Sequence, residues 1–326
     1  MASYSRYPCW NMAVLVLSYL AVVSALPLDV GKRAISASVF DQLEFFSQYS
    51  AAAYCVGNNN STGTKLTCPE GNCPRVEQAD TSTLTEFENS IDSDVTGFVA
   101  TDTTNSLIVI AFRGSRSLRN WITNVEFPVI PTTICANCSA STGFWTSWLE
   151  AQDGVLAAVA SARAQYPNFK IVATGHSLGG ALASLGAGVL RSQGTAVDLY
   201  TYGSPKIGLE DIAAYLSQTN LGQNYRATHL NDPIPRLPPA LIGYRHITPE
   251  YYITSGDDVL PTTNDITELE GSVNLAGNEG DTGIDGDAHT FYFGNVSACA
   301  GADGEFFKRE LEDGLVERMV VVEESR

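Results

Sequence analysis

The segment IVATGHSLGGALASL, residues 171–185, restricts the fold more than any other part of the chain. An apolar run that predicts a strand leads into Gly175-x-Ser177-x-Gly179, and a helix of small residues follows. This order predicts a sharp turn, in which a side chain at either glycine would collide with the neighbouring strand or helix. The turn would project the Ser177 hydroxyl above a sheet, with the Leu178 amide pointing into the same space. Ser177 is therefore a candidate nucleophile, and Leu178 is a candidate oxyanion donor.

Apolar runs and helical periods alternate on both sides of this turn. Strands are predicted at residues 95–100, 107–112, 169–174, 197–202 and 225–230. Helices are predicted at about 145–165, 178–191 and 210–217, and an amphipathic helix opens the mature domain with Val39, Leu43, Phe46 and Ala53. Such alternation is typical of a mostly parallel sheet with helices on both faces. At 326 residues the chain is long enough for one large α/β core, followed by a loop-rich part after Asn231.

A serine hydroxyl is a weak nucleophile at neutral pH, so Ser177 needs a base and a carboxylate that orients the base. Hydrolases with this turn place the three groups in the chain order serine, carboxylate, histidine. Of the four histidines, His176 in the turn and His229 inside a predicted strand are interpreted as structural. His289 closes a Gly- and Asp-rich loop before a predicted aromatic strand, HTFYFG, and is the candidate base. His246 is the alternative.

The candidate carboxylate is Asp232, which directly follows the predicted strand 225–230. Active sites of open α/β sheets are built at such strand ends. The oxyanion of an acyl-transfer intermediate needs a second donor besides Leu178. Ser115, just past the strand 107–112, is the candidate for that role, with a turn or cap serine as the alternative. This chemistry requires neither a metal nor a cofactor.

The first 33 residues are interpreted as targeting and processing segments. The apolar run Met12 to Val23 ends in Val-Ser-Ala, which predicts a signal peptide over 1–25 and secretion. The run is too short to span a bilayer, although a membrane anchor is the alternative. The dibasic pair Lys32-Arg33 predicts a propeptide over 26–33 and a catalytic domain over 34–300. The net charge of −17 argues against nucleic acid or an anionic membrane as a partner, and we expect a soluble monomer.

The cysteine count also fits a secreted protein. Without Cys9 in the signal segment six of the seven remain, and an even set predicts three disulfides. The six are Cys55, Cys68, Cys73, Cys135, Cys138 and Cys299. Their short spacings pair Cys68 with Cys73 and Cys135 with Cys138, which leaves Cys55 to pair with Cys299. The CANC pair, residues 135–138, is alternatively a redox or metal pair.

Four asparagines lie in an N-x-S/T pattern, which is the acceptor for N-linked glycans. They are Asn59, Asn60, Asn137 and Asn295.

These features together resemble the secreted fungal lipases of the class 3 lipase family. The matching segments cover most of residues 39–299 and are FRGSRS, WITNVEF, TGHSLGGALASL, YTYGSPKIG, THLNDPIPRLPP, TPEYYITSG and DAHTFYFG. The resemblance implies an α/β-hydrolase-like fold that acts on carboxylic esters, with Ser177, Asp232 and His289 as a catalytic triad. It also implies the two oxyanion donors and the three disulfide pairings given above.

The resemblance further assigns a short lid helix to Leu118–Asn124. Apolar side chains recur here at i, i+3, i+4 and i+7, in Leu118, Trp121, Ile122 and Val125. Their plain interpretation is a helix that faces the core. In the family, the lid covers the serine in water and moves aside at a lipid surface, and two turns of helix move at modest cost. The apolar stripe favours a lipase over the feruloyl esterases of the family, which carry a polar flap.

We therefore predict a secreted triacylglycerol lipase that acts on acylglycerols at a lipid–water interface. The alternatives are an esterase for soluble or aromatic esters, a phospholipase, and an inactive hydrolase that serves as a binding protein. Residues 301–326 extend past the usual end of the family and carry an apolar residue at every fourth position from Phe307 to Met319. This C-terminal extension is interpreted as a packed or disordered tail, with an interface-binding segment and a removable piece as alternatives.

Overall fold

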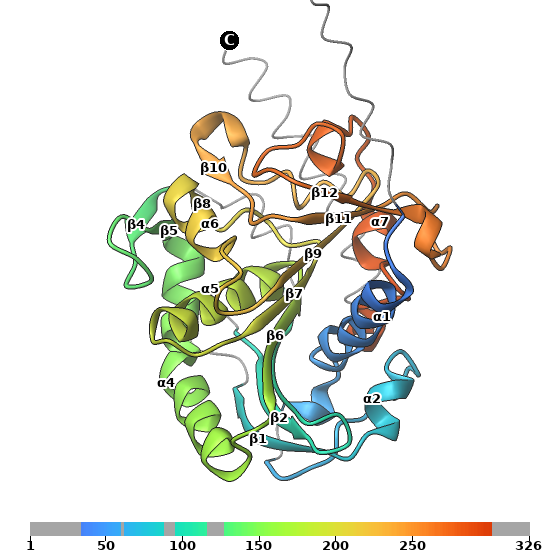
Figure 1. The fold of residues 1–326 in the computed structure, drawn as a ribbon. Helices are drawn as coiled ribbons and strands as arrows, with labels where there is room; N and C mark the ends of the chain where they lie inside the picture. The colour runs from blue at the N-terminus through green and yellow to red at the C-terminus, as the bar shows by residue number, and fades with distance from the viewer. Residues whose placement is uncertain (1–33, 60–61, 88–94, 116–126, 302–326) are drawn as a thin grey trace, which may run out of the picture. The chain divides into compact units, whose positions relative to one another are not determined.

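The computed structural model describes residues 34–59, 62–87, 95–115 and 127–301, all of which belong to one unit, Lys32–Arg326. The centre of this unit is an eight-stranded sheet in the order β1-β2-β3-β6-β7-β9-β11-β12 (Figure 1). The strands are β1 (Thr81–Phe87), β2 (Gly97–Asp102), β3 (Leu107–Phe112), β6 (Lys170–His176), β7 (Asp198–Tyr202), β9 (Asn224–His229), β11 (Glu250–Ile253) and β12 (Ile266–Leu269).

Five neighbouring strands of this sheet, β3, β6, β7, β9 and β11, run parallel to one another. The outer strands β1, β2 and β12 pair antiparallel to their neighbours. The sheet is therefore mixed with a parallel centre, as predicted. Because the five parallel strands end at one edge of the sheet, the segments that follow them are brought together there.

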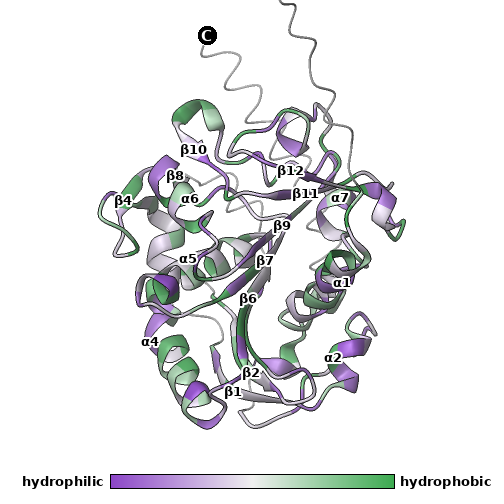
Figure 2. Cartoon of the chain, viewed as in Figure 1, coloured by the Kyte–Doolittle hydropathy of each residue, from purple (hydrophilic) through white to green (hydrophobic). Residues whose placement is uncertain are grey.

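Helices cover both faces of the sheet (Figure 1), with α1 (Ala37–Ala52) on one face and α4 (Thr142–Gln165) and α5 (Leu178–Ser192) on the other. All six residues of β3 are buried, because alternate side chains enter different cores. Ile108 and Phe112 belong to the core on the α4 and α5 side, whereas Val109 belongs to the core on the α1 side. In Figure 2, α1 and α4 carry both polar and apolar colour, which fits helices with one face on the sheet and one in water.

A second, smaller sheet has the order β10-β8-β5-β4. Its strands are β4 (Val129–Pro131), β5 (Ser139–Ser141), β8 (Gly208–Leu209) and β10 (Tyr244–Arg245). The short helices are α2 (Pro74–Gln78), α6 (Glu210–Leu216) and α7 (Gly286–Thr290), with 3-10 turns at η1 (Val56–Asn58), η2 (Ala240–Ile242), η3 (Thr263–Asp265), η4 (Asn278–Gly280) and η5 (Ala298–Ala300).

One sequence prediction for the C-terminal half is confirmed, and one is wrong. The part after Asn231 consists mostly of loops and short turns, as expected, although β11 and β12 extend the main sheet there. The segment HTFYFG does not form a strand. His289 lies in α7, since the Asp285 side chain accepts hydrogen bonds from the main-chain N–H groups of Asp287 and Ala288 and caps a helix.

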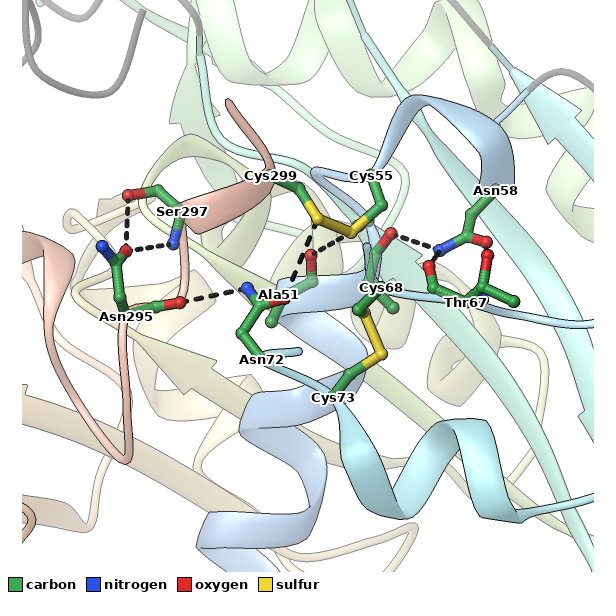
Figure 3. The surroundings of a disulfide bond; sticks show 12 residues. Ala51, Cys55, Asn58, Thr67, Cys68, Asn72, Cys73, Asn295, Ser297 and Cys299 are labelled. Carbon is green, nitrogen blue, oxygen red and sulfur yellow. Dashed lines mark hydrogen bonds between the residues drawn. A yellow bond between two sulfur atoms is a disulfide. The ribbon is translucent and has the colours of Figure 1, made fainter. Parts of the chain in front are cut away.

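The structure contains three disulfides, in the pairings predicted. Cys55 is joined to Cys299, 244 residues later, and this bond links the end of α1 to the end of the described chain (Figure 3). The other two, Cys68–Cys73 and Cys135–Cys138, close short loops. The CANC pair is thus a disulfide, which leaves its sulfurs with no thiolate to offer a metal.

The predicted glycan acceptors lie in different surroundings. Asn59 is 3% exposed, and its Nδ2 donates to the Ala53 oxygen at 2.9 Å, so the structure argues against a glycan at this residue. Asn137 and Asn295 are exposed. The Asn295 Oδ1 accepts hydrogen bonds from Ser297, at 3.1 Å from the main-chain nitrogen and 3.3 Å from the hydroxyl (Figure 3).

Several predicted features lie outside the described residues. They are the signal peptide, the propeptide, Asn60, the lid residues Leu118 to Val125 and the C-terminal extension after Gly301. Within the described part of the chain, no helix combines the length and the apolar character needed to cross a membrane.

Candidate active site

The turn between β6 and α5 has the strained geometry that the G-x-S-x-G pattern predicts. Ser177 adopts φ 57° and ψ −131°, a conformation that residues with a side chain rarely adopt. A Cβ at Gly175 would lie 2.2 Å from the Gly179 oxygen, and one at Gly179 would lie 2.2 Å from the Phe112 oxygen of β3. Both positions therefore require glycine, because the helix start packs directly against two strands.

The Ser177 side chain is fully buried, and its Oγ has no hydrogen-bond partner among the described residues. The main-chain N–H of Ser177 donates to the Tyr202 oxygen at 2.9 Å, which fixes the turn to the end of β7. Leu178 is the first residue of α5, so its N–H is one of the groups that helix geometry leaves without an acceptor inside the helix. The hydroxyl and this N–H are thus available to a bound molecule.

Asp232 and His289, predicted as partners from the sequence, are in contact. The His289 Nδ1 lies 2.9 Å from both carboxylate oxygens of Asp232, and both side chains are fully buried. Asp232 follows β9 after Asn231, whose φ of 65° reverses the chain, and His289 comes from α7. The loop after β7 approaches the pair so closely that a Cβ at Gly203 would lie 2.9 Å from the Asp232 Oδ2.

Further donors hold the Asp232 carboxylate. The Tyr292 hydroxyl donates to Oδ2 at 2.5 Å, and the Ile234 N–H donates to Oδ1 at 2.9 Å. Burial alone would raise the pKa of Asp232, but the electrostatic attraction and hydrogen bond of His289, with the hydrogen bonds from the Tyr292 hydroxyl and the Ile234 N–H, outweigh it and lower this pKa below 3.8. The carboxylate therefore stays ionised at neutral pH. Sequence reasoning missed Tyr292, whose only signal is its place three residues after His289.

His176 connects the turn to the base. Its Nε2 donates to the main-chain oxygen of His289 at 2.7 Å, so its Nδ1 is left to accept from the Tyr54 hydroxyl, also at 2.7 Å. Burial, and secondarily the electrostatic interaction with His289, lowers the pKa of His176 to about 3. His176 is therefore neutral and structural, as predicted. Because it is the sequence neighbour of Ser177, its bond places the His289 peptide beside the nucleophile turn.

The alternative base, His246, is not brought to Asp232. Its Nε2 contacts the Pro235 oxygen at 2.6 Å, and it lines a separate cavity of about 10 Å³ with Arg226. Burial, followed by the charges of Arg226 and Lys206, lowers the pKa of His246 well below 6.5. His229, interpreted as structural, contacts the main-chain oxygens of Ala288 and Ser255.

Ser115 is the last residue of the described segment 95–115. A Cβ at the preceding Gly114 would lie 3.1 Å from the Ser177 Cβ, so the loop after β3 runs directly past the nucleophile turn. The loop that carries the predicted second oxyanion donor, Ser115, therefore lies beside the proposed nucleophile. Among the described residues, the one group of three potential metal ligands is Cys55, Cys68 and Cys299, and all three sulfurs are bound in disulfides.

Comparison with known proteins places the chain among proteins of one kind. Residues 109–242 match the family described as lipase (class 3), and residues 12–85 match the lipase 3 N-terminal region. A secreted mono- and diacylglycerol lipase A from Penicillium cyclopium is 42% identical, over 87% of this chain and 94% of its own length. The crystal structure of a mono- and diacylglycerol lipase from Aspergillus oryzae has 41% identity and a TM-score of 0.77, over 81% of this chain and all of the other. A solved triacylglycerol lipase, described as having a serine protease triad as its catalytic centre, has 29% identity and a TM-score of 0.70, over 82% and 99%.

Proposed function

The chain belongs to the class 3 lipase family, and from this premise we propose that it is a secreted lipase that hydrolyses acylglycerol esters through an acyl-enzyme on Ser177. The observation that carries the proposal is the buried Asp232–His289 pair beside a strained serine turn. Family membership makes the chain a carboxylic ester hydrolase with an α/β-hydrolase fold. The secreted relatives, the three disulfides and the predicted signal peptide support secretion.

The tautomer of His289 defines the direction of proton transfer. Because an ionised carboxylate only accepts hydrogen bonds, the Nδ1 that faces Asp232 carries the proton. The Nε2 then holds a lone pair and acts as the base. As Ser177 Oγ attacks the ester carbonyl, its proton passes to this nitrogen, and Asp232 stabilises the imidazolium that forms.

The tetrahedral intermediate collapses when His289 gives this proton to the departing glycerol oxygen, which leaves the acyl group on Ser177. Water, deprotonated by His289, attacks the acyl-enzyme in the second half, and Ser177 leaves as its proton returns. The Leu178 N–H and Ser115 are proposed to bind the oxyanion in both halves. Preorganised donors of this kind lower the barrier because they are already aimed at the charge that develops.

The number of acyl chains on the glycerol is a separate question. The sequence-based prediction is a triacylglycerol lipase, and the 29% identical triacylglycerol lipase supports it. The 42% identical relative from Penicillium cyclopium and the 41% identical protein from Aspergillus oryzae are named mono- and diacylglycerol lipases, which favours partial glycerides as a second candidate. Initial rates on emulsified triolein, diolein and monoolein separate the two. A triolein rate close to the diolein rate supports the first candidate, and a negligible triolein rate supports the second.

The lid over Leu118–Asn124 is part of the proposal, and its support is the apolar stripe in the sequence. We expect the activity on tributyrin to rise abruptly above the solubility limit, because an apolar lid opens at a lipid surface. An esterase for soluble or aromatic esters would saturate smoothly instead.

The test of the proposed function is hydrolysis of tributyrin by the wild type and by Ser177→Ala. We expect the variant to lose at least about a thousandfold in kcat, since removal of a triad member leaves only the oxyanion hole and binding. Ser184→Ala is a matched control, because the Ser184 hydroxyl donates inside α5 to the Gly180 oxygen. Equal activity in Ser177→Ala and wild type would show that another residue performs the chemistry.

A further inference from the structure

We propose that Asn278 is a positioning residue for the reaction, which holds the turn that carries Asp232; this inference rests on the proposed function. Asn278 is 1% exposed and belongs to η4, which carries none of the three proposed catalytic residues. Its side-chain Nδ2 lies 2.8 Å from the main-chain oxygen of His229 and 2.8 Å from that of Asp232. One amide group thus joins the last residue of β9 to the proposed catalytic acid.

These two hydrogen bonds lie on either side of the one residue in this turn that has an unusual backbone conformation. Asn231, between the two bonded carbonyls, has φ 65°. A residue with a side chain holds such a conformation only where its surroundings impose it. Both contacted atoms are carbonyl oxygens, so the NH₂ group of Asn278 must face them, and its Oδ1 has no hydrogen-bond partner among the described residues. The Asn278 side chain therefore acts through the two N–H donors of its amide.

Asn278 is itself fixed to the main sheet. Its main-chain N–H donates to the Glu250 Oε1 at 3.2 Å, and Glu250 forms a buried ion pair with Arg226 of β9 at 3.4 Å. A Cβ at the preceding Gly277 would lie 2.4 Å from the Glu250 carboxylate, so this contact depends on glycine. A buried ion pair with additional hydrogen bonds resists movement, because separating it would leave charges unpaired. The Asn278 amide thus ties the position of Asp232 to strands β9 and β11.

The segment that begins at Asn278 also leads to the base. The Asp281 carboxylate accepts from the Asn231 N–H at 2.9 Å, and the Asp285 N–H donates to the Asn231 oxygen at 3.0 Å. Asp285 then caps α7, which carries His289. The segment 278–289 therefore contacts the turn that carries Asp232 near its start and carries His289 at its end. Asn278 makes the direct hydrogen bond from this segment to the main chain of Asp232.

Loss of the amide should loosen the contact between Asp232 and His289 without altering substrate binding, because the amide contacts the turn that carries Asp232 and the Asp281 carboxylate, which itself holds this turn. In Asn278→Ala we expect kcat per active site to fall about tenfold, the effect of losing two buried hydrogen bonds, with KM unchanged. The far-downfield proton resonance of the His289 Nδ1–H should weaken or shift upfield. A residue with a purely structural role would lower the amount of active enzyme and leave both readouts unchanged.

The experiment compares wild type, Asn278→Ala, Asn278→Asp and Asn274→Ala, with active sites counted by a phosphonate titrant. Asn278→Asp keeps the volume and removes the donors, so it carries the test if the alanine variant does not fold. Asn274 donates to the Glu270 oxygen within its own loop, and Asn274→Ala should match wild type. Wild-type kcat and an unchanged Nδ1–H resonance in a folded Asn278 variant would overturn the positioning role. Absence of hydrolysis in wild type would instead overturn the proposed function.

Discussion

The imidazole of His176 donates a hydrogen bond of 2.7 Å to the main-chain oxygen of His289. The residue before the proposed nucleophile thus holds the peptide of the proposed base, and the two reach each other across 113 residues of sequence. The same ring accepts from Tyr54 at the end of α1. The site is consequently assembled by main-chain contacts as well as by side chains, and burial of the His176 ring in it makes the stability depend on pH.

Acid should destabilise the protein through His176. Its pKa is about 3 in the folded protein and 6.5 in an unfolded chain, so between these values the unfolded state binds more protons. Stability contributed by the neutral ring is complete above pH 6.5 and falls by up to about 1.4 kcal/mol per pH unit as the pH drops toward 3. Asp232, whose pKa is lowered from 3.8, adds a further loss only below that pH.

Urea unfolding at pH 7 and pH 5 measures this effect. The variant His176→Asn keeps a donor and does not titrate, so its free energy of unfolding should change less between the two pH values than that of wild type. An identical change in both proteins would remove His176 as the cause.

The Tyr292 hydroxyl should contribute to catalysis through Asp232. Tyr292→Phe removes the 2.5 Å hydrogen bond to a buried carboxylate, and we expect kcat to fall about tenfold, since bonds to charged groups are worth about 1.5–3 kcal/mol. Tyr202→Phe is the matched control, because its hydroxyl donates to the Leu43 oxygen and not to the site. Initial rates of tributyrin hydrolysis give kcat for both variants. A Tyr292→Phe enzyme with wild-type kcat would show that Ile234 and His289 suffice to hold the carboxylate.

The disulfides should differ in their contribution to stability. Cys55–Cys299 closes a loop of 244 residues, for which the chain-entropy model gives about 5 kcal/mol, whereas Cys135–Cys138 spans three residues and gives about 2 kcal/mol. The double variant Cys55→Ser/Cys299→Ser should therefore have a lower Tm than Cys135→Ser/Cys138→Ser in the same buffer. A lower Tm in Cys135→Ser/Cys138→Ser would instead mean that the Cys55–Cys299 disulfide does not stabilise the protein mainly by restricting the unfolded chain.

A glycan is expected at Asn295 and not at Asn59. Asn295 is exposed with its Nδ2 outside the hydrogen bonds to Ser297, whereas the Asn59 Nδ2 is buried and donates to Ala53. Enzymatic release of glycans in heavy-oxygen water, after expression in a eukaryotic host, should label the Asn295 peptide. Fragmentation that assigns the label to Asn59 and leaves Asn295 unmodified would contradict the expectation.

The centre of the fold could be predicted from sequence because its signals are local. The run Leu107–Phe112 and the helix that starts at Leu178 have the bounds expected of them, since apolar runs and the glycine turn mark their ends. The contact of Asp232 with His289 follows from chain order and strand ends. Tyr292 and Asn278 could not be found this way, because their roles depend on bonds that span 60 and 46 residues.

The errors have physical causes as well. HTFYFG has the aromatic content of a strand, but the Asp285 cap starts a helix too short for a 3.6-residue period to reveal. The strand β11 directly follows Pro249 and begins with Glu250, which forms the ion pair with Arg226. Because a proline and a charged residue are unusual in a buried strand, the sequence did not reveal β11. A local cap thus decides the first place, and a long-range ion pair overrides the local pattern in the second.

The central claim is that Ser177 becomes a nucleophile because Asp232 and His289 activate it. The most direct measurement is mass spectrometry of the protein after reaction with an alkyl p-nitrophenyl phosphonate, which forms a bond to an activated serine and releases nitrophenol. We predict one adduct per chain, on the peptide that contains Ser177, with labelling slowed strongly in Asp232→Asn. An adduct on another residue, or full hydrolytic activity in a protein whose Ser177 stays unlabelled, would contradict the account.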